Sequence, residues 1–85
     1  MATADTISQK LIAALSPAEI EVQDVSHQHA GHAGWRPGGG THFEVTIKAG
    51  VFAGKSRVQR HRMVNAILAE DLAGGVHALQ LHLSD

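Results

Sequence analysis

The sequence contains no cysteine among its 85 residues. This absence excludes a disulfide staple, and it means that any sulfur ligand for a metal must come from another molecule. Aromatic side chains are also few, with one tryptophan, two phenylalanines and no tyrosine, so the chain offers no stacking platform for nucleic-acid bases. No apolar run approaches the roughly 20 residues that cross a bilayer. Met1 to Leu15 lacks the pattern of a signal peptide, and we therefore expect a soluble, cytoplasmic protein.

Histidine, by contrast, is abundant, with seven residues. Neutral imidazole is a common metal ligand and a proton switch near neutral pH, so a chain rich in histidine and free of thiolates can offer nitrogen to a metal. Three of these residues lie in one Gly-rich stretch whose backbone can bend enough for their rings to converge, namely His27, His29 and His32. Gly/His stretches are equally often solvated loops, so both interpretations stay open.

The charged residues nearly balance, with a formal net charge of −1. This balance argues against tight nonspecific binding to nucleic acid. The basic residues are nonetheless concentrated, because four of the seven lie close together at Lys55, Arg57, Arg60 and Arg62. Since these side chains cannot all point into a core, we expect a positive patch on one face of the molecule.

Apolar residues at helical spacing predict two helical regions. The first covers residues 6–15, with a capping box at Thr6-Ile7-Ser8-Gln9 and a stop at Ser16-Pro17. The second covers residues 56–72, where Val58 is out of phase with the apolar stripe. This mismatch predicts a short first turn, a bend near Arg60-His61 and then a longer helix, which ends at Gly74-Gly75.

Alternating apolar and polar residues predict three strands, over residues 20–25, 43–48 and 77–83. The first two strands are separated by the sixteen residues 26–41, and structureless connections of that length are usually functional or disordered. The element order is then α-β-β-α-α-β. We expect the first two strands to be antiparallel and the last two to be parallel, joined by a right-handed helical crossover. The expected fold class is α+β, a three-stranded mixed sheet with helices on one face.

Most isolated motifs have a structural explanation. Residues 49–56 resemble a phosphate-binding loop but fail its glycine spacing, so we expect Phe52 to fill the core and Gly54 to permit a tight turn. In the alternation of the last strand, His77 falls on the same face as the leucines. It is also the first residue of that strand, so a core histidine and an accessible histidine are both possible. His61 is expected to be structural and His82 exposed. No nucleophile–base pair stands out, and we do not expect an enzyme.

Several linked motifs together resemble the BolA family, and the similarity runs from about residue 8 to residue 83. They are Ser26-x-x-His29, Thr41-His42-Phe43, Phe52-x-Gly54-Lys55-Ser56, Arg60-His61-Arg62-x-Val64-Asn65 and Val76-His77-Ala78-Leu79. The resemblance implies a single BolA-like domain over residues 1–85, with a topology close to the type II KH fold. The chain departs from the family pattern at Val25, where relatives often have an acidic residue, and in its additional loop histidines.

The resemblance also implies a function as the partner of a monothiol glutaredoxin. The two proteins would share a 2Fe-2S cluster together with glutathione, in iron-sulfur cluster trafficking or in iron and redox regulation, and no cofactor is expected in the isolated protein. The implied metal ligand is His77. By the Ser-x-x-His spacing a second ligand is His29, with His27 and His32 as alternates. Such a partner would borrow its thiolates, and histidine ligation raises the reduction potential of a cluster, as in Rieske centres.

The alternative is a DNA-binding transcriptional regulator that uses the positive patch of Lys55, Arg57, Arg60 and Arg62, because some BolA proteins are described in that way. KH domains, however, clamp the nucleic-acid backbone with a Gly-x-x-Gly between two central helices. The only such string here, Gly31-His32-Ala33-Gly34, lies in the wrong loop. We expect no membrane partner, and a monomer or weak homodimer when the protein is free.

Overall fold

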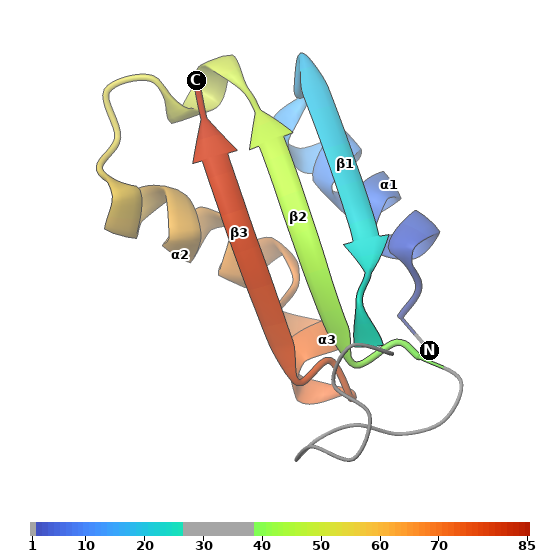
Figure 1. The fold of residues 1–85 in the computed structure, drawn as a ribbon. Helices are drawn as coiled ribbons and strands as arrows, with labels where there is room; N and C mark the ends of the chain where they lie inside the picture. Colours follow the sequence, from blue (N-terminus) through green and yellow to red (C-terminus); the bar gives the residue numbers. More distant parts are fainter. Residues whose placement is uncertain (1, 27–38) are drawn as a thin grey trace.

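The computed structural model describes residues 2–26 and 39–85 of the chain. These residues form a sheet and a layer of helices (Figure 1). In chain order the elements are α1 (Ala4–Leu15), β1 (Glu19–Asp24), β2 (His42–Lys48), the 3-10 turn η2 (Gly50–Phe52), α2 (Arg57–Ile67), α3 (Ala69–Ala73) and β3 (Ala78–Ser84). No helix within the described ranges is long and apolar enough to cross a membrane.

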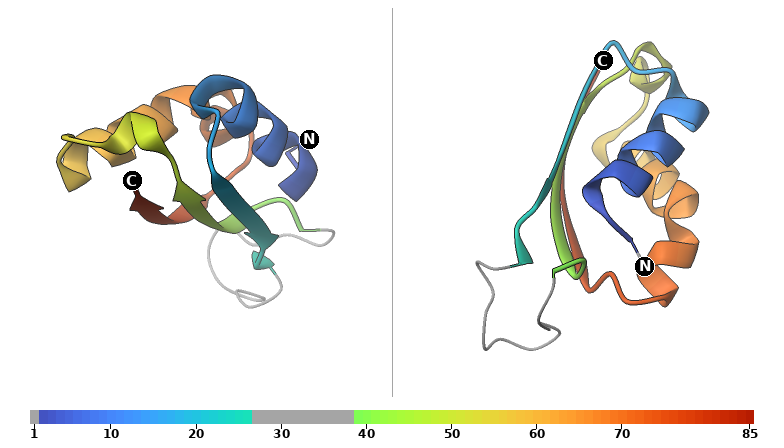
Figure 2. Two further views of the ribbon diagram at one scale, coloured as in Figure 1. Left: turned by 90° about the horizontal axis from the view of Figure 1, so that it is seen from above. Right: turned by 90° about the vertical axis from the view of Figure 1, so that its right-hand side faces the viewer.

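The three strands form one mixed sheet in the order β1-β2-β3. β1 pairs with β2 in the antiparallel sense, with Ile20 opposite Ile47, and β2 pairs with β3 in the parallel sense, with Phe43 opposite Leu79. The helices all lie on one face of this sheet (Figure 2). The α+β class, the strand directions and the one-sided helical layer that the sequence predicts are therefore confirmed.

The core lies between the sheet and the helices. Alternate residues of β2 are fully buried against the apolar stripe of α1 and against α2, and the buried cluster includes Val45, Ile47, Ile7, Leu11 and Val64. Each such side chain contributes about 1.5–3 kcal/mol when it leaves water. Phe52 is 0% exposed, which confirms its predicted role in the core. Gly54 has a φ of +75°, so the predicted tight turn is also present.

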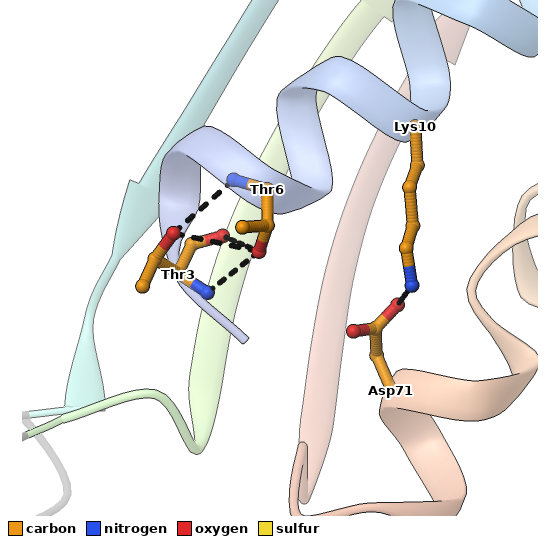
Figure 3. A network of polar contacts seen from close by, with 4 residues as sticks. All are labelled: Thr3, Thr6, Lys10 and Asp71. Carbon is orange, nitrogen blue, oxygen red and sulfur yellow. Dashed lines mark hydrogen bonds and ion pairs between the residues drawn. The ribbon is translucent and has the colours of Figure 1, made fainter. Parts of the chain in front are cut away.

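Helix α1 begins earlier than the sequence pattern predicts. Its N-cap is Thr3, whose hydroxyl accepts a hydrogen bond from the Thr6 N–H at 3.1 Å, while the Thr6 hydroxyl accepts from the Thr3 N–H at 2.9 Å (Figure 3). The predicted capping box at Thr6 is therefore wrong by three residues, because Thr6 supplies the reciprocal bond of the box and not its start. The helix ends as predicted beside Ser16, which adopts a left-handed conformation.

The predicted bend at Arg60-His61 is also wrong. Helix α2 runs unbroken from Arg57 to Ile67, and the break before α3 falls at Leu68, where φ is −100° and ψ is 18°. Val58 is out of phase with the apolar stripe because its side chain is 56% exposed and does not belong to the core. A capping box between Ser56 and Gln59 secures the first turn, so a single helix accommodates the whole segment.

An ion pair links the first and last helices. Lys10 Nζ on α1 lies 2.7 Å from Asp71 Oδ2 on α3 (Figure 3). The hydrogen bond that Lys10 donates to the Asp71 carboxylate raises the pKa of Lys10 above its ordinary value of 10.5. A raised pKa means that the native state holds this proton more tightly than the unfolded chain does, so the stabilisation is present below pH 10.5 and is lost as the pH rises through the native pKa.

Replacing Asp71 with asparagine should therefore lower the denaturant midpoint at neutral pH by a small amount, since the Lys10 side chain is partly exposed. The difference between the variant and the parent protein should shrink as the pH rises beyond 10.5, where Lys10 loses its charge. Urea titrations at neutral and strongly alkaline pH would measure both differences. If the denaturant midpoints of the variant and the parent protein differed by the same amount at every pH, an electrostatic role for this pair would be contradicted.

Candidate functional site

The clearest concentration of polar groups lies at one end of the sheet, where β1 ends and both β2 and β3 begin. We call this region the loop end of the sheet (Figure 1). The antiparallel and parallel pairings bring these three strand ends together, because Asp24 lies opposite Phe43 and Ala78 lies opposite His42. Residues more than thirty positions apart in the chain thus meet at one edge.

Ser26 is the central hydrogen-bonding residue of the loop end. Its side chain is 1% exposed. The Ser26 hydroxyl oxygen accepts hydrogen bonds from the backbone N–H groups of Thr41 at 3.0 Å and His42 at 3.1 Å, and the hydroxyl donates to the carboxylate of Asp24. Since a buried backbone N–H without a partner is costly, this one hydroxyl stabilises the start of β2.

Asp24 completes the closure of the loop end. Its second carboxylate oxygen accepts a hydrogen bond from the Gly40 N–H at 2.9 Å. The neighbouring Gly39 has a φ of +79°, and a Cβ atom there would lie 2.7 Å from the same oxygen, so a glycine is required on both counts. Asp24 and Ser26 together therefore hold the two ends of the connection between β1 and β2, whose residues 27–38 lie outside the described part.

His77 stands at the loop end with its side chain exposed. It immediately precedes β3, and its backbone N–H donates to the carbonyl oxygen of Thr41 at 2.6 Å. Of the two interpretations that the sequence leaves open, the accessible histidine is therefore right and the core histidine is wrong. Because β3 begins only at Ala78, the alternation of buried and exposed side chains along the strand does not extend to His77.

His42 is a neighbour of His77 that sequence reasoning missed. Its side chain is only 5% exposed, and its ring centroid lies 5.3 Å from that of His77 with the two ring planes tilted by 54°. Its Nδ1 atom lies 2.8 Å from the hydroxyl oxygen of Thr41. Alternation along β2 assigns His42 to the exposed face, but the loop end buries it. The exposed ring of His77 thus rests on a buried, hydrogen-bonded ring.

The other candidate metal ligands are not all placed. His29, His27 and His32 lie outside the described residues, so the structure positions only the Ser26 end of their loop. Within residues 2–26 and 39–85, no three histidine or carboxylate side chains are close enough to hold a metal ion. At the loop end the described part of the chain thus provides His77 as a single accessible nitrogen donor.

Arg60 lines a groove beside β3 and also binds neighbouring backbone. Its Nε donates to the backbone carbonyl oxygens of Phe52 and Lys55, both at 3.1 Å, and its Nη1 lies 3.5 Å from the carbonyl oxygen of Leu83. Its guanidinium also lies 6.0 Å from the centre of the Phe52 ring. These bonds stabilise the turn before α2, and the contact of Arg60 with a partner stays a prediction.

The remaining basic side chains are divided between two sides of α2. Arg57 lines the groove beside β3 together with Lys55, Arg60 and the partly buried His61. Arg62 lies in a separate shallow depression with Gln59 and Met63, and Lys55 borders both. Three of the four basic residues therefore line one groove, and Arg62 lies apart from it. A helix presents residues five positions apart on well-separated sides, which the clustering in sequence concealed.

His82 is exposed, as the sequence predicts. It lies on the sheet face opposite to the helices, where its Nε2 is 3.1 Å from a carboxylate oxygen of Glu44. The two residues come from neighbouring strands, since His82 lies opposite Thr46 and Glu44 lies opposite Gln80. This histidine is remote from the loop end in the strand register, and it therefore provides a matched control for His77.

Residues 11–85 match the protein family described as BolA-like protein. The chain is 47% identical over 79 residues to "SufE-like protein 1, chloroplastic/mitochondrial" of Arabidopsis thaliana. The matched region covers 88% of this chain and 21% of that protein. It is 41% identical over 78 residues to the "DNA-binding transcriptional regulator BolA" of Escherichia coli strain K12. This match covers 92% of this chain and 70% of that protein. The solved BolA domain of SufE1 from Arabidopsis thaliana has a TM-score of 0.86 at 43% identity, covering 95% of this chain and 88% of that one.

Proposed function

The chain belongs to the BolA family, and on this premise we propose that it is a non-enzymatic partner of a monothiol glutaredoxin. The two proteins would share a 2Fe-2S cluster, in iron-sulfur cluster trafficking or in iron and redox regulation. The chain spans only about a fifth of the length of its plant relative SufE-like protein 1, so the activity of that whole protein is not transferred to it.

The observation that carries the proposal is the setting of His77. Its imidazole is exposed, its backbone is held by the hydrogen bond to Thr41, and its ring rests on the buried ring of His42. A metal ligand benefits from support of this kind, because a side chain that is already oriented loses less freedom on binding. The loop end therefore presents one nitrogen donor in a prepared position.

The donor set of the chain also fits shared ligation. The chain has no cysteine, so it can contribute imidazole nitrogen but no thiolate to a 2Fe-2S cluster. In this proposal the glutaredoxin and its glutathione supply the thiolates. When bound, such a cluster supplies one-electron redox chemistry at a potential that histidine ligation raises. The role of this chain is to hold His77 at the interface, with His29 as the proposed second donor and His27 and His32 as alternates.

The closed loop end supports the choice of a donor from the loop. Ser26 lies three residues before His29 and is hydrogen-bonded to the starting residues of β2, one of which accepts the His77 N–H. Ser26, the last described residue before the loop, is therefore linked through Thr41 to the backbone of His77. This placement does not distinguish among the three loop histidines, and single replacement of each is needed to do so.

Replacing His77 with alanine tests the proposal, and His82→Ala, on the strand that follows His77, is the matched control. Each protein would be mixed with a monothiol glutaredoxin, iron, sulfide and glutathione, and the visible absorption and circular dichroism spectra recorded. We expect the parent protein and the His82 variant to give a heterodimer spectrum distinct from that of the glutaredoxin alone. The His77 variant should lose this spectrum while its far-ultraviolet spectrum stays unchanged. A His77 variant with the parent spectrum and cluster lifetime would contradict the proposal.

A DNA-binding role is the second candidate, favoured by the name of the Escherichia coli relative and by the exposed basic side chains. The structure weakens it in one respect, since Arg60 is occupied by backbone carbonyls and Arg57 is separated from Arg62. Binding through phosphate contacts would make the DNA affinity fall steeply with salt concentration. A shallow salt dependence would therefore leave the glutaredoxin partnership as the better account.

Cytoplasmic location is part of the first proposal. The name of the Arabidopsis thaliana relative assigns that protein to chloroplasts and mitochondria, so location differs among members of this family or is set outside the domain they share. Fractionation of cells that express the full-length protein at its natural level would test the assignment. Recovery in an organelle fraction would replace the cytoplasmic glutaredoxin with an organellar one as the proposed partner.

A further inference from the structure

The outer edge of β3 faces away from the rest of the sheet, because β3 is the last strand in the order β1-β2-β3 (Figure 1). The Ala78 N–H donates to the Thr41 carbonyl oxygen, and the Ser84 carbonyl oxygen accepts from the Ala49 N–H. In a parallel ladder alternate residues bond to the same neighbour. Residues 78, 80, 82 and 84 therefore direct their backbone groups toward β2. The backbone groups of Leu79, Leu81 and Leu83 point outward.

This outer edge is largely unpaired within the described ranges. Among the described residues its only hydrogen bond is the weak one from Arg60 Nη1 to the Leu83 carbonyl oxygen at 3.5 Å. The peptide groups of Leu79 and Leu81 have no partner on that side among the described residues. Proteins commonly protect such edges with proline, lysine or a bulge in the strand. The seven residues of β3 contain no proline or lysine, so the edge can accept another strand.

A positively charged groove of about 520 Å³ adjoins the same edge. One side is formed by residues 81–84 of β3, and the other by Lys55, Arg57, Arg60 and His61 from α2 and the turn before it. Arg60 also lies 3.6 Å from a carboxylate oxygen of Asp85, whereas no ion pair of Lys55 or Arg57 is found among the described residues. No aspartate or glutamate is among the residues that line it. An extended chain lying along β3 would therefore place alternate side chains close to the charged ends of Lys55 and Arg57.

The charge of the groove decides which occupant fits. Two copies of this protein that paired through β3 would bring two cationic grooves together, which is unfavourable. The opposite edge of the sheet, β1, carries Glu19, Glu21 and Asp24. Pairing of β1 with the β3 of another copy would match in charge, but this head-to-tail contact would repeat from copy to copy and produce a ring or an open filament. A separate acidic strand satisfies the backbone groups and the charges without either difficulty.

We propose that the outer edge of β3 and the adjoining groove bind an extended acidic segment of a partner protein by strand addition. The backbone groups of Leu79 and Leu81 pair with the segment, and its carboxylates contact Lys55, Arg57 and His61. Backbone pairing of this kind provides affinity, and the flanking side chains select the sequence. This contact uses none of the proposed metal ligands, so it stands or falls separately from the glutaredoxin proposal.

The first measurement uses a short fluorescent peptide of alternating glutamate and valine as the probe, with a peptide of alternating lysine and valine as its control. Amide hydrogen exchange, followed by nuclear magnetic resonance, reports each backbone N–H separately. We expect the acidic peptide to slow exchange at Leu79 and Leu81 by about tenfold or more near saturation. Gln80 and His82, which already bond to β2, should change little. This alternating pattern identifies strand addition, since simple ion pairing does not produce it.

The second measurement compares the exposed arginines on two sides of α2. Arg57→Glu reverses a charge in the groove, whereas Arg62→Glu makes the same change outside it. We expect Arg57→Glu to weaken binding of the acidic peptide by about fivefold or more, and Arg62→Glu to change it by less than about twofold.

Three results would overturn the proposal. The first is no binding of the acidic peptide at about 1 mM, which corresponds to a binding free energy weaker than about −4 kcal/mol. The second is binding that does not protect Leu79 and Leu81, or that the lysine peptide matches. The third is self-association of the protein in sedimentation experiments that protects the same two amides, since the edge would then serve another copy.

Discussion

Replacing Ser26 with alanine is expected to lower the free energy of unfolding by about 3 kcal/mol, because its single hydroxyl is shared by two buried N–H groups and a carboxylate. Alanine would leave the Thr41 and His42 N–H groups without this acceptor. An unpaired buried donor costs about 1–3 kcal/mol, so the two together account for the estimate. A domain of this size has a total stability of only about 5–15 kcal/mol, and the loss is therefore large.

Urea denaturation followed by circular dichroism measures this loss, and Ser84→Ala provides the control. Ser84 is an exposed serine near the end of β3, so its replacement should change the unfolding free energy by less than about 0.5 kcal/mol. If Ser26→Ala cost no more than the control, the hydrogen bonds at the loop end would not stabilise the fold in the way proposed here.

The Ser26 variant should also separate structure from function. Its loop end would be loosened while His77 and the loop histidines remained in the sequence. Formation of the glutaredoxin heterodimer spectrum should therefore weaken even at temperatures where the variant is folded. If a folded Ser26 variant gave the parent spectrum, binding of the cluster by the histidines would not depend on the hydrogen bonds at the loop end.

The largest expected effect on the proposed complex is its loss on acidification. Iron and a proton compete for the same imidazole nitrogen, and free imidazole takes up its proton at about pH 6.5. Metal binding favours the unprotonated form, so the complex should persist at neutral pH and fail as the pH falls below that value. We expect the cluster absorption of the heterodimer to show a transition between about pH 5 and 6.5.

Replacement of both His29 and His77 should abolish that transition, whereas His82→Ala should leave it in place. A glutaredoxin homodimer with thiolate ligands alone supplies the reference for acid attack on sulfur. Titrations of absorbance against pH for the four samples would be compared directly. Identical curves for the heterodimer, the double variant and the homodimer would mean that histidine is not a ligand in this complex.

Local patterns in the sequence were sufficient to predict most of the fold. Alternation in Phe43, Val45 and Ile47 marks the central strand, and helical spacing in Ile7, Leu11 and Leu15 marks the first helix, because the period of burial follows directly from the backbone geometry. Strand directions follow from the connections, since a helical crossover joins parallel strands and a single loop joins antiparallel ones. These features depend on neighbours in sequence, which is why they can be predicted.

Competing local signals were resolved only by tertiary structure. Both Thr3 and Thr6 are good capping residues, and their reciprocal hydrogen bonds show which of them starts α1. The position of Val58 outside the apolar stripe was compatible with a bent helix or with a straight helix on which Val58 is exposed. In the structure α2 is continuous and Val58 is exposed. Such alternatives differ little in local energy, so the surrounding packing decides between them.

At the candidate site the sequence by itself determined which side chains are available: several imidazoles, a cluster of basic residues and no thiolate. Tertiary structure alone placed His42 beside His77, joined Ser26 to the start of β2 and used Arg60 to bind backbone carbonyls from two segments. The physical reason is that these contacts join residues 8 to 35 positions apart. Their energies appear only when the strands pair, and no periodicity in the chain records them.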